Sequence, residues 1–172
     1  MKFILISPKN RTTYNFRGDL LKEIISKGYE VIVTGPNEEG IEKIKELGVR
    51  FVRIPLDKNG LSAVADIKYM IALRRLLKEE KPDVTLGYTI KPVIYGAIAS
   101  KLAGVKNINS MVTGLGYVFT ANTLKAKVIR TIASILYRIG FICANTVIFQ
   151  NQDDLEEFVE RKLLKREKCK LV

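Results

Sequence analysis

The chain has 172 residues, of which 47% are hydrophobic and 27% charged, and its formal net charge is +11. A chain of this length and composition is expected to fold as one globular domain that needs neither a disulfide nor a metal ion to hold it together. The sequence contains no histidine, which excludes serine–histidine and cysteine–histidine catalysis within these residues.

Cellular location follows from the cysteines and the first residues. Cys143 and Cys169 are far apart and form no C-x-x-C pair, so neither a zinc site nor a redox dithiol is indicated. The apolar run at residues 3–6 is too short for a signal peptide. We therefore expect a cytoplasmic protein.

Strand-like and helix-like segments alternate along the chain. This alternation predicts an α/β fold, a three-layer αβα Rossmann-like domain whose doubly wound parallel sheet is covered by helices on both faces. Strands are expected at residues 2–7, 30–34, 50–54, 83–87, 107–112 and 145–150. Helices are expected at residues 14–27, 38–47, 62–80, 91–103, 124–143 and 153–162.

Several details of these elements can be predicted as well. Thr12 or Thr13 should cap the first helix, and Gly28 should close it. The periodicity of helix 62–80 is expected to turn six apolar residues inward, namely Ala63, Ile67, Met70, Ile71, Leu73 and Leu77. Residues 168–172 should begin a further strand, which suggests a larger architecture than these residues alone.

Residues 84–152 contain no aspartate or glutamate, although they carry seven lysine and arginine residues. A site within this stretch should therefore attract an anion, and the net charge favours a phosphate-bearing ligand. The same absence excludes a carboxylate base or a carboxylate metal cage from these residues, and no metal site is expected. A carboxylate would have to reach in from Asp19, Asp57 or Asp66.

In an open doubly wound sheet, ligands bind beyond the carboxyl ends of the strands, where the strand order reverses. Two of the loops selected by this rule are residues 8–13 and 87–90. The first leads into a helix with Arg11, Asn15 and Arg17 nearby, which indicates a phosphate or carboxylate receptor. The second places Tyr88 and Lys91 toward the crevice. A solvated loop, a packed tyrosine and a solvated lysine are the structural alternatives.

The third loop selected by the rule, residues 113–121, contains Thr113, Gly114, Gly116 and Tyr117. Two glycines separated by one residue at a strand end resemble a nucleotide-binding turn. Phe119 occupies the place of the third glycine of G-x-G-x-x-G, however, and no glycine follows the first strand until Gly18, so a dehydrogenase is disfavoured.

Helix 124–143 is unusually apolar, and its charges are Lys125, Lys127, Arg130 and Arg138. The arginines interrupt it too often for a membrane span. It is either a buried helix with a basic edge or a peripheral contact with an anionic membrane.

Segments 88–99 and 109–117, with residues 15–17 and 81–84 in support, resemble the N-terminal domain of family 4 glycosyltransferases of the GT-B fold. The resemblance is strongest to bacterial enzymes that add sugars to polyprenyl-diphosphate-linked acceptors in capsule, lipopolysaccharide and glycan assembly. It implies an enzyme with two Rossmann-like domains, in which the N-terminal domain holds the acceptor. The C-terminal domain would hold the nucleotide-sugar donor and an E-x7-E motif.

The resemblance covers nearly all of residues 1–172, so a donor domain is expected outside them, no cofactor is expected within them, and the isolated domain should be inactive. Transfer with retention of configuration, of a hexosyl or N-acetylhexosaminyl group, is implied, without a protein nucleophile. By loop position, Arg11, Arg17 and Lys91 would orient phosphates, while Asn15, Tyr88 and Tyr117, beside Gly116, would contact sugar. Thr113 and Gly114 are the candidates for a catalytic role.

The expected partners are the donor domain and a glycan or lipid-diphosphate acceptor, with peripheral contact between residues 124–143 and the inner face of the plasma membrane. The net charge alone also fits a basic nucleic-acid-binding module. Apolar strands of the kind covered on both faces are not typical of RNA readers, so nucleic acid is not expected as a partner. A further alternative is a separate acceptor or regulatory subunit of a two-chain transferase.

Overall fold

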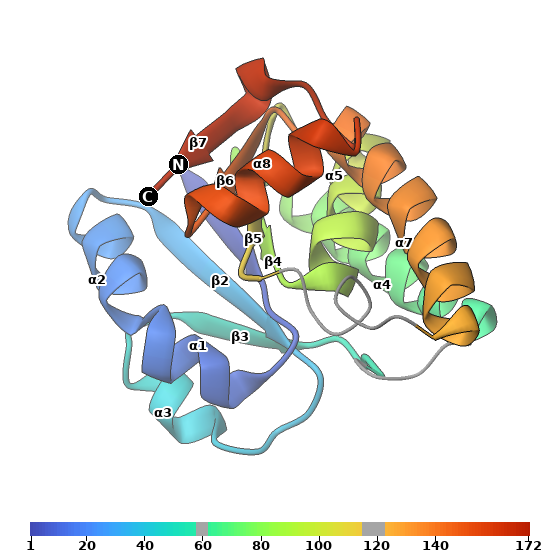
Figure 1. The fold of residues 1–172 in the computed structure, drawn as a ribbon. Helices are drawn as coiled ribbons and strands as arrows, with labels where there is room; N and C mark the ends of the chain where they lie inside the picture. Colours follow the sequence, from blue (N-terminus) through green and yellow to red (C-terminus); the bar gives the residue numbers. More distant parts are fainter. Residues whose placement is uncertain (58–61, 115–122) are drawn as a thin grey trace.

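The computed structural model describes residues 1–57, 62–114 and 123–172. Seven parallel strands form one sheet in the order β3-β2-β1-β4-β5-β6-β7 (Figure 1). The strands are β1 (Lys2–Ile6), β2 (Glu30–Gly35), β3 (Arg50–Arg53), β4 (Val84–Tyr88), β5 (Asn107–Val112), β6 (Thr146–Phe149) and β7 (Cys169–Leu171). The order reverses between β1 and β4, which confirms the doubly wound sheet, and β7 confirms the strand expected at residues 168–172.

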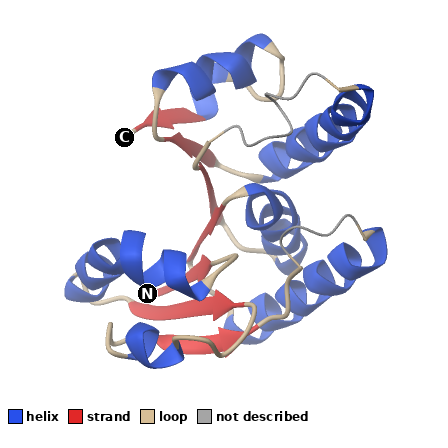
Figure 2. Ribbon diagram, turned by 60° about the horizontal axis from the view of Figure 1, so that its bottom comes forward, coloured by secondary structure: helices blue, strands red, loops and turns tan. Residues whose placement is uncertain are grey.

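Helices cover the sheet on both faces (Figure 2). One layer consists of α1 (Asn10–Phe16), α2 (Gly18–Ser26) and α3 (Ile41–Lys45), over a core built on Leu5, Leu21 and Val33. The other layer consists of α4 (Ala63–Glu80), the π-helical turn η1 (Pro92–Gly96), α5 (Ala97–Ala103), α7 (Leu124–Cys143) and α8 (Gln152–Glu160). A 3-10 turn, η2 (Arg166–Lys168), leads into β7.

The first helix differs from its prediction. It begins at Asn10, with Lys9 as a cap residue that provides no side-chain hydrogen bond, so the expected caps Thr12 and Thr13 are wrong. The helix also breaks at Arg17, whose backbone leaves helical geometry at φ −125° and separates α1 from α2. Gly28 has φ +82° after the end of α2, as its C-cap position requires.

In α4 the inward face was partly mispredicted. Ile67 and Ile71 are 51% and 57% exposed, whereas Tyr69 and Leu76 are buried together with Leu73. Apolar residues occur all around this helix, so their spacing alone did not identify the buried side. The predicted start is confirmed, because the Ser62 hydroxyl accepts a hydrogen bond from the backbone N–H of Ala65 at 3.3 Å.

Two glycines allow η1 to pack between β4 and α7. A Cβ atom on Gly87 would lie 2.6 Å from the carbonyl oxygen of Pro92, and one on Gly140 would lie 2.9 Å from the Cα of Ile94. Both neighbours are backbone atoms, which cannot move aside as a flexible side chain can. This close packing fixes the segment that follows β4, at the point where the strand order reverses.

Candidate functional site

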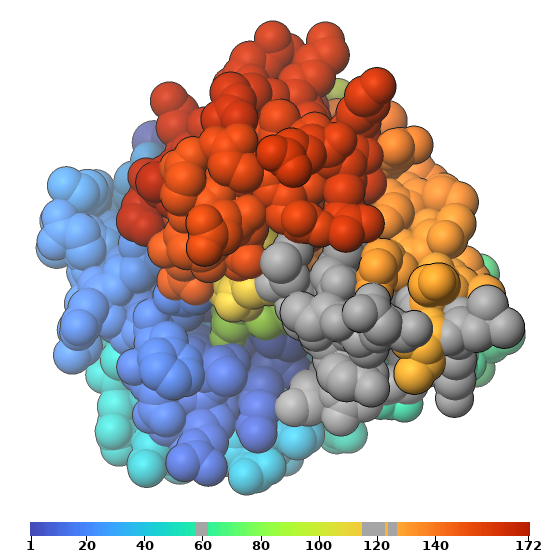
Figure 3. Space-filling model, viewed as in Figure 1, coloured from blue at the N-terminus to red at the C-terminus, as the bar shows by residue number. Residues whose placement is uncertain are grey.

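The carboxyl ends of β1, β4, β5 and β6 surround a cavity of about 300 Å³, here called the switch-point cavity. In the space-filling view a hollow opens at this place, where green and yellow atoms of the β4–β5 region are visible between the orange-red C-terminal part above and the blue N-terminal part below (Figure 3). The cavity is lined by Thr12, Phe16, Arg17, Tyr88, Thr89, Thr113 and Gln150. It therefore brings together residues of the first helix and the two further loops that the sequence selected.

Tyr88 forms the floor of this cavity and is 2% exposed. Its hydroxyl lies 2.7 Å from Ser7 Oγ, 2.9 Å from Thr12 Oγ1 and 3.1 Å from Thr13 Oγ1. Ser7 Oγ is also 2.6 Å from Thr13 Oγ1, which closes a buried hydroxyl cluster. The tyrosine thus links the end of β4 to the loop after β1, and buried hydroxyls satisfy its phenolic oxygen.

Arg17 lies over the ring of Tyr88, with the guanidinium carbon 5.2 Å from the ring centroid. Its Nη1 donates to the carbonyl of Phe16 at 3.1 Å. Its Nε is buried without a hydrogen-bond partner, and no carboxylate of the described residues pairs with the side chain. The cavity therefore holds a guanidinium whose charge is not neutralised within the described part of the chain.

The rim contains an unusual backbone conformation. Thr89 has φ +66°, a left-handed value that is rare for a β-branched residue. Such strain costs on the order of 1–3 kcal/mol and is concentrated at functional sites. Thr113 is exposed on the opposite rim, and Gly114 follows it with φ +136°.

Two of the remaining candidate residues, Gly116 and Tyr117, lie outside the described residues. Asn15 is exposed on α1 and does not line the cavity.

Lys91 is engaged elsewhere. Its Nζ lies 2.5 Å from Asp66 Oδ1 and donates to the backbone carbonyl of Asp57 at 2.7 Å. The Tyr95 hydroxyl donates to the other oxygen of Asp66 at 3.0 Å, and burial followed by this carboxylate raises the pKa of Tyr95 to about 12. This cluster ties η1 to α4 and to the segment after β3. A phosphate-binding role for Lys91 stays a prediction.

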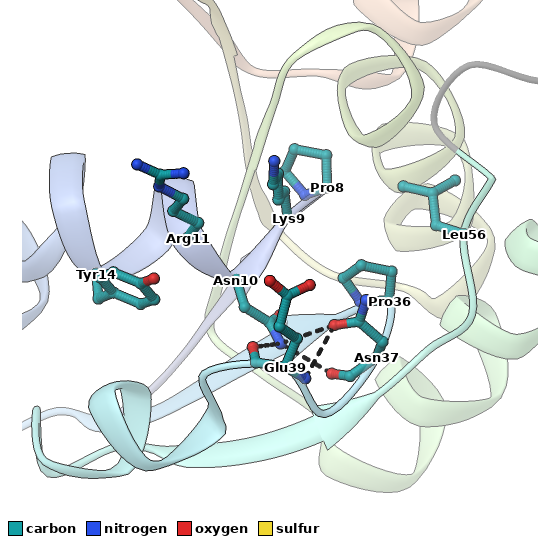
Figure 4. A pocket seen from close by; sticks show the side chains of 9 residues that line it. All are labelled: Pro8, Lys9, Asn10, Arg11, Tyr14, Pro36, Asn37, Glu39 and Leu56. Atoms are coloured by element: carbon teal, nitrogen blue, oxygen red, sulfur yellow. Dashed lines mark hydrogen bonds between the residues drawn. The ribbon is translucent and has the colours of Figure 1, made fainter.

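Arg11 lines a different pocket, of about 170 Å³, between α1 and the segment that follows β2 (Figure 4). Asn10 holds the two walls together, because its Nδ2 donates to the carbonyls of Asn37 and Glu39 at 2.8 Å each. A Cβ on Gly35 would come within 2.0 Å of Asn10 Oδ1, so this approach requires a glycine. Arg11 on α1 and Arg17 at the end of α1 thus line separate pockets.

Four lining residues were not named as site residues from the sequence, namely Thr12, Phe16, Thr89 and Gln150. Gln150 follows β6, so the strand-end rule would have found it had the rule been extended to that strand. Thr89 belonged to a selected loop, but nothing in its residue type indicates the positive φ. Phe16 is 70% exposed, and a single apolar residue on a helix gives no signal of a site.

Within residues 1–57, 62–114 and 123–172, no group of three or more histidine, cysteine, aspartate or glutamate side chains is arranged to hold a metal ion. In the same part of the chain, no helix has both the length and the apolar character needed to cross a membrane.

The chain is similar in sequence to two bacterial glycosyltransferases. Over 156 residues the chain is 26% identical to the N,N'-diacetylbacillosaminyl-diphospho-undecaprenol alpha-1,3-N-acetylgalactosaminyltransferase of Campylobacter jejuni, a match that covers 91% of this chain and 42% of that protein. Over 108 residues it is 31% identical to the UDP-Gal:alpha-D-GlcNAc-diphosphoundecaprenol alpha-1,3-galactosyltransferase of Escherichia coli, covering 63% and 27%. The chain spans less than half the length of these relatives.

Solved structures agree on the fold. The lipopolysaccharide outer core galactosyltransferase WaaB matches with a TM-score of 0.66 at 14% identity, over 99% of this chain and 44% of that one. UDP-N-acetylglucosamine 2-epimerases share the fold, so the fold by itself does not separate the two classes of enzyme. The family model described as "Glycosyl transferase 4-like" matches residues 4–151. The resemblance inferred from the sequence is therefore confirmed, and the chain belongs to the glycosyl transferase 4-like family.

Proposed function

We propose that the chain is the acceptor-binding half of a retaining glycosyltransferase. The enzyme would move a sugar from a nucleotide sugar to a polyprenyl-diphosphate-linked saccharide during synthesis of a cell-surface glycan, at the cytoplasmic face of the membrane. The names of the two curated relatives support this acceptor class, since both specify a sugar joined to a diphospho-undecaprenol carrier.

The observation that carries the proposal is Arg17. Its guanidinium lines a cavity at the point where the strand order reverses, and no carboxylate of the described residues neutralises it. An arginine with free N–H groups is suited to a phosphate oxygen, because its planar fork can donate two parallel hydrogen bonds. The ring of Tyr88 beneath it limits the positions that the guanidinium can adopt.

The saccharide part of the acceptor would lie along the rim. Thr89, Thr113 and Gln150 present polar groups there. The loop that continues from Thr113 and Gly114 through Gly116 and Tyr117 would face the reacting centre. Arg11 and Asn15, on the outer side of α1, would contact more distant parts of the acceptor, and Lys91 would join them if its pair with Asp66 opened.

The donor would be bound by residues beyond 1–172. This part of the proposal is supported by the share of the relatives that the chain covers, 42% and 27% of their lengths. The absence of aspartate and glutamate from residues 84–152 agrees with a reaction that uses no carboxylate nucleophile from these loops. A donor domain or a separate donor subunit would complete the site.

Binding of a water-soluble acceptor analogue to the chain tests the proposal without a membrane. The analogue is a saccharide diphosphate with a short isoprenyl chain, titrated by calorimetry in parallel with a UDP-sugar. We expect the chain to bind the analogue and not the UDP-sugar. Arg17→Ala should weaken binding about 10- to 100-fold, the value of a charge-assisted hydrogen bond, and Arg17→Lys should weaken it less.

Lys22→Ala provides a matched control, because Lys22 is exposed on α2 away from the cavity. It should leave affinity unchanged. An equal loss of affinity in Arg17→Ala and Lys22→Ala would mean that binding depends only on net charge, and it would contradict the proposed site. Binding of the UDP-sugar alone, or salt-sensitive binding of random oligonucleotides in preference to the analogue, would contradict the proposed function.

A further inference from the structure

The pocket that Arg11 lines, here called the β2-end pocket, lies between the segment that follows β1 and the segment that follows β2 (Figure 4). Its volume of about 170 Å³ is about that of six water molecules, which suits a single sugar ring. It shares no lining residue with the switch-point cavity, although Arg11 and Thr12, which line one pocket each, are consecutive in α1. The two pockets are therefore separate.

The wall of the β2-end pocket is fixed by a buried side chain. Asn10 is 2% exposed, and besides its bonds to two backbone carbonyls its Nδ2 lies 3.3 Å from Asn37 Oδ1. The same Oδ1 accepts a hydrogen bond from the backbone N–H of Glu39 at 3.2 Å. The backbone that carries Glu39 is thus held in place by hydrogen bonds within the chain, as expected of a pocket that is formed before a ligand arrives.

Three charged side chains at this pocket have no opposite charge beside them. Among the described residues, no carboxylate pairs with Lys9 or Arg11, and no cation pairs with Glu39. The neighbouring Glu38, by contrast, lies 3.9 Å from Arg53. The side chains of Lys9, Arg11 and Glu39 point toward the same side of the pocket, the upper side in the view (Figure 4). The pocket therefore offers donors and a charged acceptor together.

This combination favours a polyhydroxyl ligand over a phosphate. Lysine and arginine side chains only donate hydrogen bonds, and an ionised carboxylate only accepts them. A phosphate diester offers acceptors alone, and it would meet the carboxylate of Glu39 as a like charge. A sugar hydroxyl donates and accepts, so two neighbouring hydroxyls can donate to one carboxylate. In dinucleotide-binding Rossmann domains an acidic side chain binds a ribose hydroxyl in this way.

The rest of the lining includes apolar surface. It is provided by Tyr14, Pro36 and Leu56, together with Pro8. Gly40 brings the tyrosine ring close to the wall, since a Cβ there would lie 3.2 Å from Tyr14 Cε1. The C–H groups of a sugar ring can pack on such a surface while its hydroxyls reach the polar side chains.

We propose that the β2-end pocket binds one sugar residue through a pair of neighbouring hydroxyl groups. The carboxylate of Glu39 would accept hydrogen bonds from both hydroxyls, and Lys9, Arg11 and the Asn37 amide would donate to oxygen atoms of the same sugar. Arg11 would thus contact sugar and not phosphate.

The occupant is a saccharide residue of the acceptor, an assignment that rests on the proposed function. The ribose of a nucleotide presents the same pair of hydroxyls. Residues 7–13 contain no glycine, however, and a dinucleotide-binding turn needs glycine at this place so that the backbone can approach the pyrophosphate. The saccharide is therefore the better occupant.

Two-dimensional NMR of the isotope-labelled 172-residue chain tests the pocket with neutral probes. The probes are the methyl glycosides of glucose, galactose, mannose, N-acetylglucosamine and N-acetylgalactosamine, each titrated alone. We expect at least one to bind in the millimolar range and to shift the amide signals of residues 9–14 and 37–40. Deoxy forms of that glycoside should identify one neighbouring pair of hydroxyls, either of which weakens binding about tenfold when it is removed.

Glu39→Gln keeps the size of the side chain and removes its charge, so it should weaken binding of the same glycoside about 10- to 100-fold. Glu38→Gln is the matched control, because it makes the same change at the adjacent residue, which does not line the pocket. It should leave the affinity unchanged. Arg11→Ala should also weaken binding, whereas Lys22→Ala on α2 should not. Circular dichroism and thermal melting confirm that each variant is folded.

Adenosine and 2'-deoxyadenosine distinguish the two sources of the hydroxyl pair. We expect both to bind more weakly than the best glycoside. Adenosine that binds more tightly than every glycoside, and loses affinity when its 2'-hydroxyl is absent, would identify ribose as the occupant and overturn the assignment to the acceptor.

Other outcomes would overturn the site itself. These are no binding of any glycoside near its solubility limit, an equal loss of affinity in Glu38→Gln and Glu39→Gln, or shifts confined to residues that line the switch-point cavity. Inorganic phosphate that shifts residues 9–14 and binds more tightly to Glu39→Gln, without binding of any glycoside, would identify an anion site instead. Because the glycosides carry no diphosphate, failure here leaves the test of Arg17 with the acceptor analogue unaffected.

Discussion

At the scale of single residues, the hydroxyl of Tyr88 organises the candidate site. It contacts the hydroxyls of Ser7, Thr12 and Thr13, which follow β1, the strand next to β4 where the strand order reverses. The ring of Tyr88 lies against Arg17. A buried group of this kind has two effects that can be separated. The hydroxyl joins two segments of the chain, whereas the ring positions the cation that we propose as the phosphate ligand.

Tyr88→Phe should separate these effects. The variant leaves the hydroxyls of Ser7 and Thr13 short of a partner, and we expect the free energy of unfolding to fall by about 1–3 kcal/mol. The ring remains beneath Arg17, so affinity for the acceptor analogue should change less than in Arg17→Ala. Urea denaturation measures the first effect and calorimetry the second.

Tyr29→Phe, at a partly buried tyrosine outside the cavity, is the control for Tyr88→Phe and should be close to neutral. Unchanged stability in Tyr88→Phe would contradict the structural role of the hydroxyl cluster.

At the scale of elements, the packing of η1 against α7 decides how the helical layer sits on the sheet. Gly140 permits it, because a Cβ there would lie 2.9 Å from Ile94 Cα and 3.2 Å from the carbonyl oxygen of Val93. Replacing a mid-helix glycine by alanine normally favours the helix by about 1 kcal/mol. Here the clash is with backbone, and relief requires α7 to move.

Gly140→Ala should therefore destabilise the protein in spite of alanine's higher helix propensity. Overpacking typically costs about 1–3 kcal/mol, which exceeds the gain from propensity. Chemical denaturation measures the difference. Thr131→Ala, on the exposed side of the same helix, should stay within about 0.5 kcal/mol of the wild type. A stabilised Gly140→Ala would show that α7 is not held this closely against η1.

At the scale of the whole molecule, buried tyrosines couple folding to alkaline pH. Burial is the main cause that raises the pKa of Tyr69, Tyr95 and Tyr137 above the usual value of 10, and for Tyr95 the result is about 12. Between pH 10 and the raised value, the unfolded chain has lost these protons while the folded chain keeps them. The unfolded state then binds fewer protons, so the free energy of unfolding falls as pH rises.

Alkaline titration is the corresponding measurement. We expect ultraviolet absorbance to show some tyrosines ionising only well above pH 10, together with loss of stability in denaturation curves across the same range. Asp66→Asn removes a carboxylate that raises the pKa of Tyr95, so it should shift that ionisation to lower pH. Ionisation of every tyrosine near pH 10 with the fold intact would contradict the buried positions of these side chains.

The prediction of the fold succeeded where the signal is local. Each of the expected strands is present within one residue at each end, because short apolar runs bounded by glycine, proline or charge mark them clearly. The prediction of the first helix was wrong because no residue type near Arg17 indicates that the helix breaks there. The prediction of the buried face of α4 was partly wrong because aliphatic residues such as Ile67 and Ile71 lie on its exposed side.

The candidate site was also predicted only in part. The strand-end rule identified loops whose members Thr12, Tyr88 and Thr113 line one cavity, and Arg17 joins them from the end of the helix that follows the first loop. The rule locates backbone, and it does not determine which side chains turn inward. Lys91 belongs to the selected region, yet its ammonium meets Asp66, which lies 25 residues earlier in the chain. Thr89 has a left-handed φ of +66°, which neither its residue type nor its neighbours in the sequence indicate.

The α/β class, the position of residues 84–152 without aspartate or glutamate, and the resemblance that the family model confirms could all be recognised from the amino-acid sequence. These properties depend on the order of residue types along the chain, and a local pattern is sufficient to read them. Three features required the folded structure: Tyr88 contacts Ser7, 81 residues away, Lys91 pairs with Asp66, and Arg17 has no carboxylate partner among the described residues. Those outcomes depend on contacts between distant segments, which form only when the sheet brings them together.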